Sequence, residues 1–103
     1  MVTEPNVKQG DILKIEKIKH PVLVVSKDYF NTSGEIVGCP IYGDSNIGPL
    51  HIAVRIEGEP GYVQCEKLAL LDLRVRGYKK ISEITMRDRM EIADTIQGIF
   101  DYV

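Results

Sequence analysis

Short apolar stretches separated by turn residues occupy the first four-fifths of the chain. Residues 22–25 are continuously apolar and β-branched after a proline, which indicates a buried strand. Residues 51–56 alternate apolar and polar positions, which indicates a strand with one buried face. Residues 11–18, 36–41 and 62–66 complete the set of candidate strands. Short strands at this spacing predict a mainly β chain folded as a small barrel.

Turn residues divide these candidate strands. Residues 30–34 form a cluster of turn formers, and residues 43–49 are the most loop-like stretch of the chain. The Gly-Glu-Pro-Gly segment at 58–61 predicts a tight turn. Pro40 has no backbone N–H to donate, so we expect it at a sheet edge or at the end of a strand.

The chain ends in a helical pattern. Thr85, followed three residues later by Asp88, is a variant of the capping box and predicts the start of a helix. Apolar residues then recur in helical steps at Met86, Met90, Ala93, Ile96, Phe100 and Val103, and Ile92 and Ile99 widen the stripe. We expect this stripe to pack on the barrel, with a surface for a partner protein as the alternative.

Length and composition limit the class of protein. The 103 residues, 44% hydrophobic and 27% charged, predict one globular domain over 1–103. No apolar run approaches the roughly 20 residues of a membrane span. The N-terminal Met-Val-Thr-Glu-Pro lacks the basic and apolar regions of a signal peptide. We therefore expect a cytoplasmic protein with no membrane association.

Charge and cysteine content add two observations. Thirteen Lys and Arg against fifteen Asp and Glu give a net charge of −2, which by itself does not indicate a nucleic-acid partner. Residues 74–80 nevertheless hold four cations and no acid, which fits either a site for a small anion or a solvated loop. Cys39 and Cys65 lie in strand-like segments, so we expect two core thiols in a reducing compartment. No metal or nucleotide motif accompanies them or the two isolated histidines.

Three sequence blocks, taken in order and spacing, resemble one protein family. Gly10-Asp11-Ile12 opens the first candidate strand; residues 21–26, Phe30-Asn31 and Cys39-Pro40-Ile41 form the second block; residues 65–72 and Arg76 form the third. Together they resemble the MazF/PemK family of toxin endoribonucleases, which share their fold with the CcdB gyrase poison. The resemblance covers nearly the whole chain.

The resemblance implies both architecture and activity. The fold would be mainly β, a small SH3-like barrel of about five to seven strands with a C-terminal α-helix. The resemblance also implies a symmetric homodimer and a cognate antitoxin protein as partner. Its activity would be sequence-preferring cleavage of single-stranded RNA in a groove at the dimer interface, leaving cyclic phosphate and 5′-hydroxyl ends. The resemblance implies no cofactor and no metal.

The chain departs from the family at the positions expected to carry chemistry. His20 stands where the family has Arg; an imidazole exchanges protons near neutral pH, so His20 is a candidate acid or base, or else a surface residue at a strand end. Tyr42 stands where the family has Thr or Ser, and would contact a base or a phosphate, or else pack at the barrel rim. Glu66 occupies an acidic family position and is the third catalytic candidate, or else a surface acid.

A second group of residues is expected to contact RNA. Its members are Arg76, Arg74, Lys79, Lys80, Gln64 and Lys67, of which Arg76 matches a family position. PemK-like members have Arg at Gln64, and the third block otherwise reads Asp-Gln followed by Arg, where this chain has Glu66-Lys67 and Ala69. We expect Asp72 to cap a turn. His51 is a weaker candidate, and the backbone amides of Ser45 and Asn46 are further candidates to meet bases.

Three functions remain open from the sequence. The first is a ribonuclease toxin whose site is rebuilt around His20 and Glu66. The second is a non-catalytic or degenerate barrel, either a gyrase-directed poison or a nucleic-acid-binding adaptor, suggested by the missing Arg and Thr. The third is an interaction module that uses the helix stripe. We favour the first.

Overall fold

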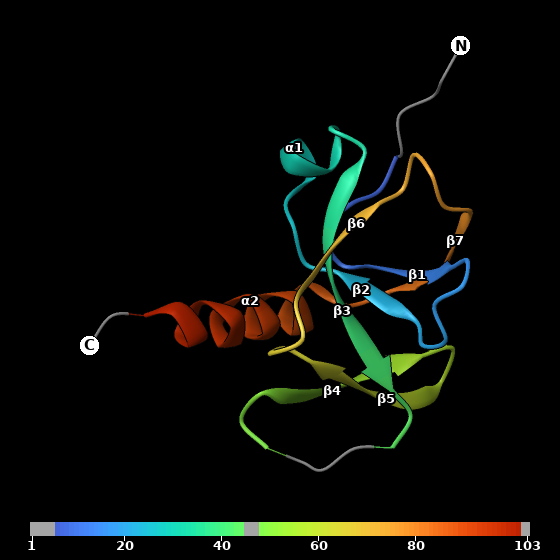
Figure 1. The fold of residues 1–103 in the computed structure, drawn as a ribbon. Coiled ribbons are helices and arrows are strands. Elements are labelled where there is room, and N and C mark those ends of the chain that lie inside the picture. The colour runs from blue at the N-terminus through green and yellow to red at the C-terminus, as the bar shows by residue number, and fades with distance from the viewer. Residues whose placement is uncertain (1–5, 45–47, 102–103) are drawn as a thin grey trace.

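Seven antiparallel strands make one strongly curled sheet in the computed structural model, which describes residues 6–44 and 48–101 (Figure 1). In chain order they are β1 (Asp11–Ile15), β2 (Val22–Val24), β3 (Glu35–Tyr42), β4 (His51–Ile56), β5 (Glu59–Gln64), β6 (Ala69–Asp72) and β7 (Tyr78–Glu83). A short helix, α1 (Asp28–Asn31), precedes β3, and a longer helix, α2 (Met86–Phe100), ends the described chain. The predicted mainly β fold with a C-terminal helix is confirmed. Strands β6 and β7 were not among the five candidate strands.

β3 is the strand that joins the two parts of the sheet. The strands are ordered β4-β5-β3-β2-β1-β7, and β6 also pairs with β3. Along one side, β3 pairs with β2 from Gly38 to Pro40. Along its other side, β6 pairs with residues 35–38 and β5 pairs with residues 41–42.

Pro40 lies inside β3, so the prediction of an edge or a strand end is wrong. The backbone N–H of Ile41 donates to Pro21 at 2.9 Å, on the β2 side. Because backbone donors alternate along a strand, the N–H that Pro40 lacks would point to the other side. There it falls between the residues that pair with β6 and those that pair with β5, where its absence breaks no ladder bond.

The β4–β5 hairpin turns earlier than the sequence indicated. Glu57 and Gly58 occupy the turn with positive φ values of 52° and 86°, and β5 already begins at Glu59. Two consecutive residues with positive φ form the two-residue hairpin loop whose twist matches that of the strands. The resulting register places His51 opposite Gln64.

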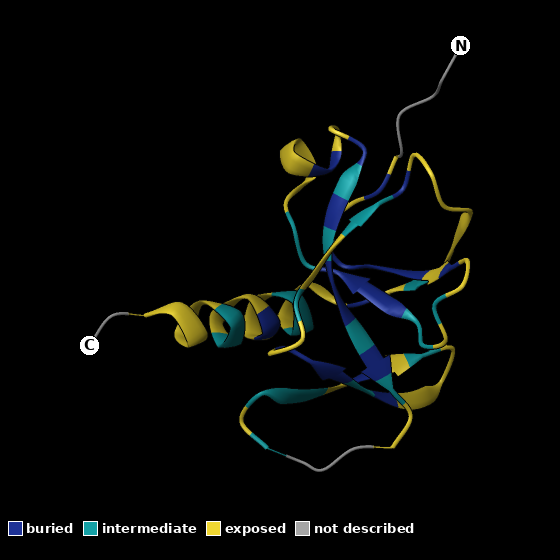
Figure 2. Cartoon of the chain, in the orientation of Figure 1, coloured by how far each residue is buried: buried dark blue, intermediate teal, exposed yellow. Residues whose placement is uncertain are grey.

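The central strands of the sheet are buried (Figure 2), and their buried side chains form two clusters, one on each face of the sheet. Ile12 and Leu23 belong to one buried cluster, whereas the neighbouring Leu13 and Val22 belong to the other. This explains why residues 22–25 read as a continuous apolar run. The two cysteines are buried and free, and both lie in the first cluster, as the sequence predicted.

α2 begins as predicted, with the Thr85 hydroxyl accepting the backbone N–H of Asp88 at 3.1 Å. Only part of its apolar stripe lies on the barrel as expected, since Ile96 packs against the first buried cluster. Ile92 is buried, but Met86 and Met90 are each 61% exposed and Phe100 is 70% exposed. Figure 1 shows the reason: the helix starts against the sheet and projects away from it. Val103, the last expected member of the stripe, lies outside the described residues.

No helix within 6–44 and 48–101 has the length and apolar character needed to cross a membrane.

Candidate functional site

His20, Tyr42 and Lys67 meet at one end of β3, and we call them the trio. The His20 and Tyr42 rings are tilted at 48°, with centroids 4.5 Å apart. The Lys67 ammonium donates to the Tyr42 hydroxyl at 3.0 Å and also lies 4.7 Å from the ring centroid. His20 and Tyr42 are half-buried, whereas Lys67 is exposed. The trio therefore places an imidazole, a phenol and a cation side by side within reach of solvent.

Strand pairing explains why these residues meet. Val22 of β2 pairs with Pro40 of β3, and extending the antiparallel register two residues further brings His20 opposite Tyr42. Lys67 follows β5 in a turn closed by its own N–H, which donates to Gln64 at 3.0 Å. Because β5 also pairs with Tyr42 in β3, this turn brings the ammonium to the same end of the strand.

The chemistry of the trio suits a phosphodiester. The hydrogen bond to Tyr42 raises the pKa of Lys67, so that ammonium is cationic at neutral pH. A fixed cation and a phenolic donor stabilise charge that develops on phosphate oxygens. An imidazole beside them is a group that takes up and returns protons at the pH of a cell.

Glu66 forms a separate pair with His51. The imidazole Nε2 and a carboxylate oxygen are 2.8 Å apart, and this hydrogen bond lowers the pKa of Glu66. In the sequence His51 stands alone in its segment, and nothing there pairs it with Glu66. With the turn at Glu57 and Gly58, His51 faces Gln64, so Glu66 follows close by. Gly58 is one half of the usual Asn-Gly or Asp-Gly hairpin signal, but Glu57 is not the other half, so the sequence marks this turn only weakly.

The remaining RNA-contact candidates are distributed over the molecule. Arg74 is bound to Asp72 through two hydrogen bonds of 2.9 and 3.0 Å. Asp72 also accepts the backbone N–H of Arg74, so its predicted turn-capping role is confirmed. Lys80 contacts the buried Asp11 at 3.2 Å. Gln64 is 2% exposed, so its side chain is closed to solvent in this conformation.

Arg76 and Lys79 are exposed, the first in the turn before β7 and the second on that strand. Ser45 and Asn46 lie outside the described residues. Among the residues that the structure describes, no group of three or more His, Cys, Asp or Glu is placed to hold a metal ion.

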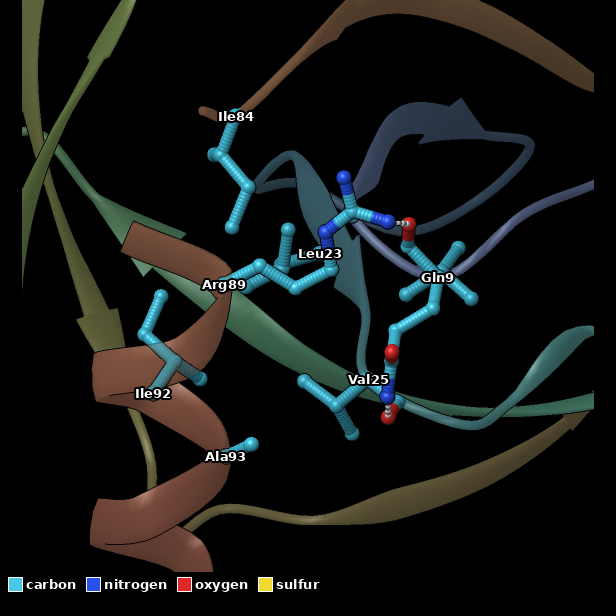
Figure 3. Close-up of a pocket in the computed structure, with 9 residues that line it drawn as sticks. Gln9, Leu23, Val25, Ile84, Arg89, Ile92 and Ala93 are labelled. Atoms are coloured by element: carbon cyan, nitrogen blue, oxygen red, sulfur yellow. Dashed lines mark hydrogen bonds between the residues drawn. The ribbon is translucent and has the colours of Figure 1, made fainter. Parts of the chain in front are cut away.

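Apart from the trio, a narrow pocket lies under α2 (Figure 3). Its walls are mostly apolar, and Arg89 reaches across it to donate to the Gln9 carbonyl at 3.3 Å. Its volume of about 10 Å³ is close to the minimum that admits a single water. This pocket is therefore too small for a ligand, and the residues that line it seat the helix against the sheet.

Comparison with known proteins identifies the family and supports the fold. A family model described as PemK-like, MazF-like toxin of type II toxin-antitoxin system matches residues 6–100. The MazE-MazF crystal structure (Form-I) from Deinococcus radiodurans has a TM-score of 0.82 at 19% identity, covering 92% of this chain and 96% of that chain. An endoribonuclease from Mycobacterial species has a TM-score of 0.79 at 18% identity, covering 91% and 90%.

A third solved structure, an endoribonuclease in complex with its cognate antitoxin from Mycobacterial species, has a TM-score of 0.73 at 18% identity, covering 94% of this chain and 99% of that chain. Comparison with curated protein sequences finds no significant match. At these identities the solved structures support the fold, and the family model, which spans nearly the whole chain, decides the family. The chain belongs to the PemK-like, MazF-like toxins of type II toxin-antitoxin systems.

Proposed function

We propose that this chain is a metal-independent endoribonuclease that cleaves single-stranded RNA in the cytoplasm. The observation that carries the proposal is the trio: three side chains suited to phosphodiester chemistry are gathered at one exposed point. Membership of a toxin family supports it, as does the likeness to solved structures described as endoribonucleases. The RNA would have a sequence preference, read by polar edges and aromatic faces around unstacked bases.

The proposed reaction is transesterification within the RNA. His20 takes the proton of a ribose 2′-hydroxyl, whose oxygen forms a bond to the adjacent phosphorus. Lys67 stabilises the negative charge on the phosphorane oxygens. The bond to the 5′-oxygen breaks, and the Tyr42 hydroxyl gives that oxygen a proton. Transfer of the His20 proton back to Tyr42 restores the enzyme and leaves cyclic phosphate and 5′-hydroxyl ends.

Glu66 has a lesser role in this proposal than the sequence suggested. Its lowered pKa keeps it ionised at neutral pH, so it is poorly suited to donate a proton. Its carboxylate is engaged by His51, whose ring it orients. We therefore place Glu66 and His51 beside the reaction and outside its proton transfers.

RNA backbone binding is assigned to the exposed cations. Arg76 and Lys79 present their charges to solvent, and each phosphate contact would make binding more sensitive to salt. Arg74 and Lys80 already have carboxylate partners, so we expect them to contribute less. Gln64 would need to leave its buried position before it could contact RNA.

We also propose a homodimer and a cognate antitoxin as partners. Met86, Met90 and Phe100 on α2 and Leu70 on β6 are all more than half exposed, so both elements present large apolar side chains to solvent. Burial of such surface is the main favourable contribution to protein association. The structure described as an endoribonuclease with its cognate antitoxin supports the second partner.

One experiment tests the enzymatic proposal. Pure protein is incubated with mixed-sequence single-stranded RNA in EDTA, and the product ends are mapped. The chain has only two histidines, which supply a matched pair of variants. We expect His20→Ala to slow cleavage by about 100-fold or more, the usual contribution of a general acid or base. His51→Ala should remain within a few-fold of the wild type.

The alternative is a non-catalytic barrel, such as a gyrase-directed poison. It is favoured by the replacement of the family's Arg and Thr by His20 and Tyr42. RNA left intact by the wild-type protein, together with inhibition of gyrase, would establish that alternative. Cleavage by His20→Ala at the wild-type rate would instead show that the site has been placed on the wrong residues.

A further inference from the structure

We infer that an apolar pocket beside the trio holds a nucleobase of the bound RNA, next to the phosphate on Lys67. The inference rests on the proposed function, since it names where that site reads its substrate. The pocket has a volume of about 330 Å³ and lies where the partner of β3 changes from β6 to β5. This volume is at the lower end of small-molecule sites, which run from roughly 300 to 1,000 Å³.

The pocket and the trio share one face of β3. Gly38, Pro40 and Tyr42 are successive alternate residues of that strand, so they point to the same side of the sheet. Lys67 lines the pocket and also donates to Tyr42. A phosphate on Lys67 would therefore have the pocket immediately beside it.

The walls of the pocket suit a flat, apolar ring. Val22 and Leu71 present aliphatic side chains, Pro40 presents its ring, and Gly38 leaves the strand without a side chain. A Cβ at Gly38 would come within 2.4 Å of a Val22 methyl carbon, so a larger residue there would displace the Val22 wall of the pocket. No carboxylate stands among the lining residues, and the one charge at the rim is the Lys67 cation.

These features favour a nucleobase over an apolar side chain of a protein. Every phosphate of RNA is flanked by a ribose that carries a base, so a phosphate on Lys67 brings a base with it. The cation at the rim attracts the RNA backbone, and the apolar space accepts the base once it is unstacked. The occupant is therefore a base of single-stranded RNA adjacent to the proposed scissile phosphate.

Ala69 provides the test. It lies on β6 opposite Gly38, lines the pocket and is exposed, so Ala69→Phe fills the space without disturbing the core. The probe is a 2′-O-methyl RNA hexamer, in which the attacking hydroxyl is blocked. A series of such hexamers is used, each lacking the base at a different position. Affinity is measured by fluorescence anisotropy. Val75→Phe, at an exposed position before β7, is the matched control.

In the wild type we expect loss of one particular base to weaken binding about tenfold, within the range for a stacked base. In Ala69→Phe the intact hexamer should bind about tenfold more weakly, and removal of that base should then change affinity less than twofold. Val75→Phe should keep the wild-type pattern. If Ala69→Phe does not fold, Ala69→Ile serves, with the same direction and a smaller change.

If removal of each base changes the affinity by the same factor in the wild type and in Ala69→Phe, the inference is overturned, whatever the cleavage assay shows. A pattern that changes as expected in a protein that does not cleave RNA upholds the base site and refutes the enzymatic proposal. Failure of the wild type to bind any hexamer at low salt refutes both.

Discussion

Replacing Gly38 with alanine puts a methyl group into space that Val22 already occupies. The added Cβ would lie 2.4 Å from a Val22 methyl carbon and 3.3 Å from the Leu23 carbonyl oxygen. Carbon atoms in contact sit about 3.5–4.0 Å apart, so the strands must separate or Val22 must change its rotamer. Because both residues lie in the middle of the sheet, neither adjustment is easy.

The expected cost combines two opposing contributions. Overpacking of a core usually costs about 1–3 kcal/mol, and this contact is a close one. Replacing glycine also stiffens the unfolded chain, which favours folding by about 0.4–1 kcal/mol. We expect Gly38→Ala to lower the free energy of unfolding by about 2 kcal/mol, a loss of roughly 8–16 °C in Tm for a domain of this size.

Urea denaturation followed by circular dichroism measures this change, at one protein concentration because association also contributes to stability. Val22→Ala identifies the cause. Alone it should cost about 2 kcal/mol, since it removes two buried methyl groups and leaves a cavity. In the Gly38→Ala background it should cost less than about 1 kcal/mol, a coupling in the usual range for residues in contact. Equal costs in both backgrounds would refute the steric account.

Three further predictions concern the turn, the thiols and one carboxylate. Glu57→Asn should raise the free energy of unfolding by about 0.5 kcal/mol, seen as a higher urea midpoint, because Asn tolerates the positive φ of 52° better than Glu. Burial raises the pKa of Cys39 to about 12 and that of Cys65 to about 11, so neither should react with a disulfide reagent at pH 8 until urea unfolds the chain. His51→Ala should raise the pKa of Glu66 towards 4.5, measured by carbon NMR of the carboxyl group. Because folding lowers the pKa of Glu66, this pair stabilises the wild type at pH values above that pKa, and the stabilisation is lost as the pH falls through it. The stability of His51→Ala should lack this dependence on pH.

The sequence correctly predicted those helices and strands that are determined by residues close together in the chain. The helix start at Thr85 and the buried strand at 22–25 depend on neighbouring residues, and both were found. The turn at 58–61 was misplaced because its Pro-Gly pair is a strong signal. The structure instead turns at Glu57 and Gly58, where the backbone twist suits a hairpin.

The other differences between the sequence predictions and the structure depend on contacts between segments that are far apart in the chain. The sequence shows that Pro40 lacks a backbone donor. Whether this breaks a hydrogen bond depends on which residues of β3 pair with β5 and which pair with β6, and the sequence does not show that pairing. The period of α2 showed which residues share a face, not whether anything covers them. The trio could not be predicted without the β2–β3 register, which alone brings His20 to Tyr42.

The four cations of residues 74–80 have a consequence for how copies of this protein meet one another. The last two of them, Lys79 and Lys80, stand on β7, the final strand of the sheet among the residues described. An open strand edge is a template on which another chain can add a strand, and lysines there discourage such growth. Lys14 lies opposite Lys79, so an approaching strand meets two neighbouring cations there, while Lys80 is paired with Asp11. A stretch that reads in the sequence as a candidate ligand site thus also discourages edge-to-edge pairing between copies of the folded chain.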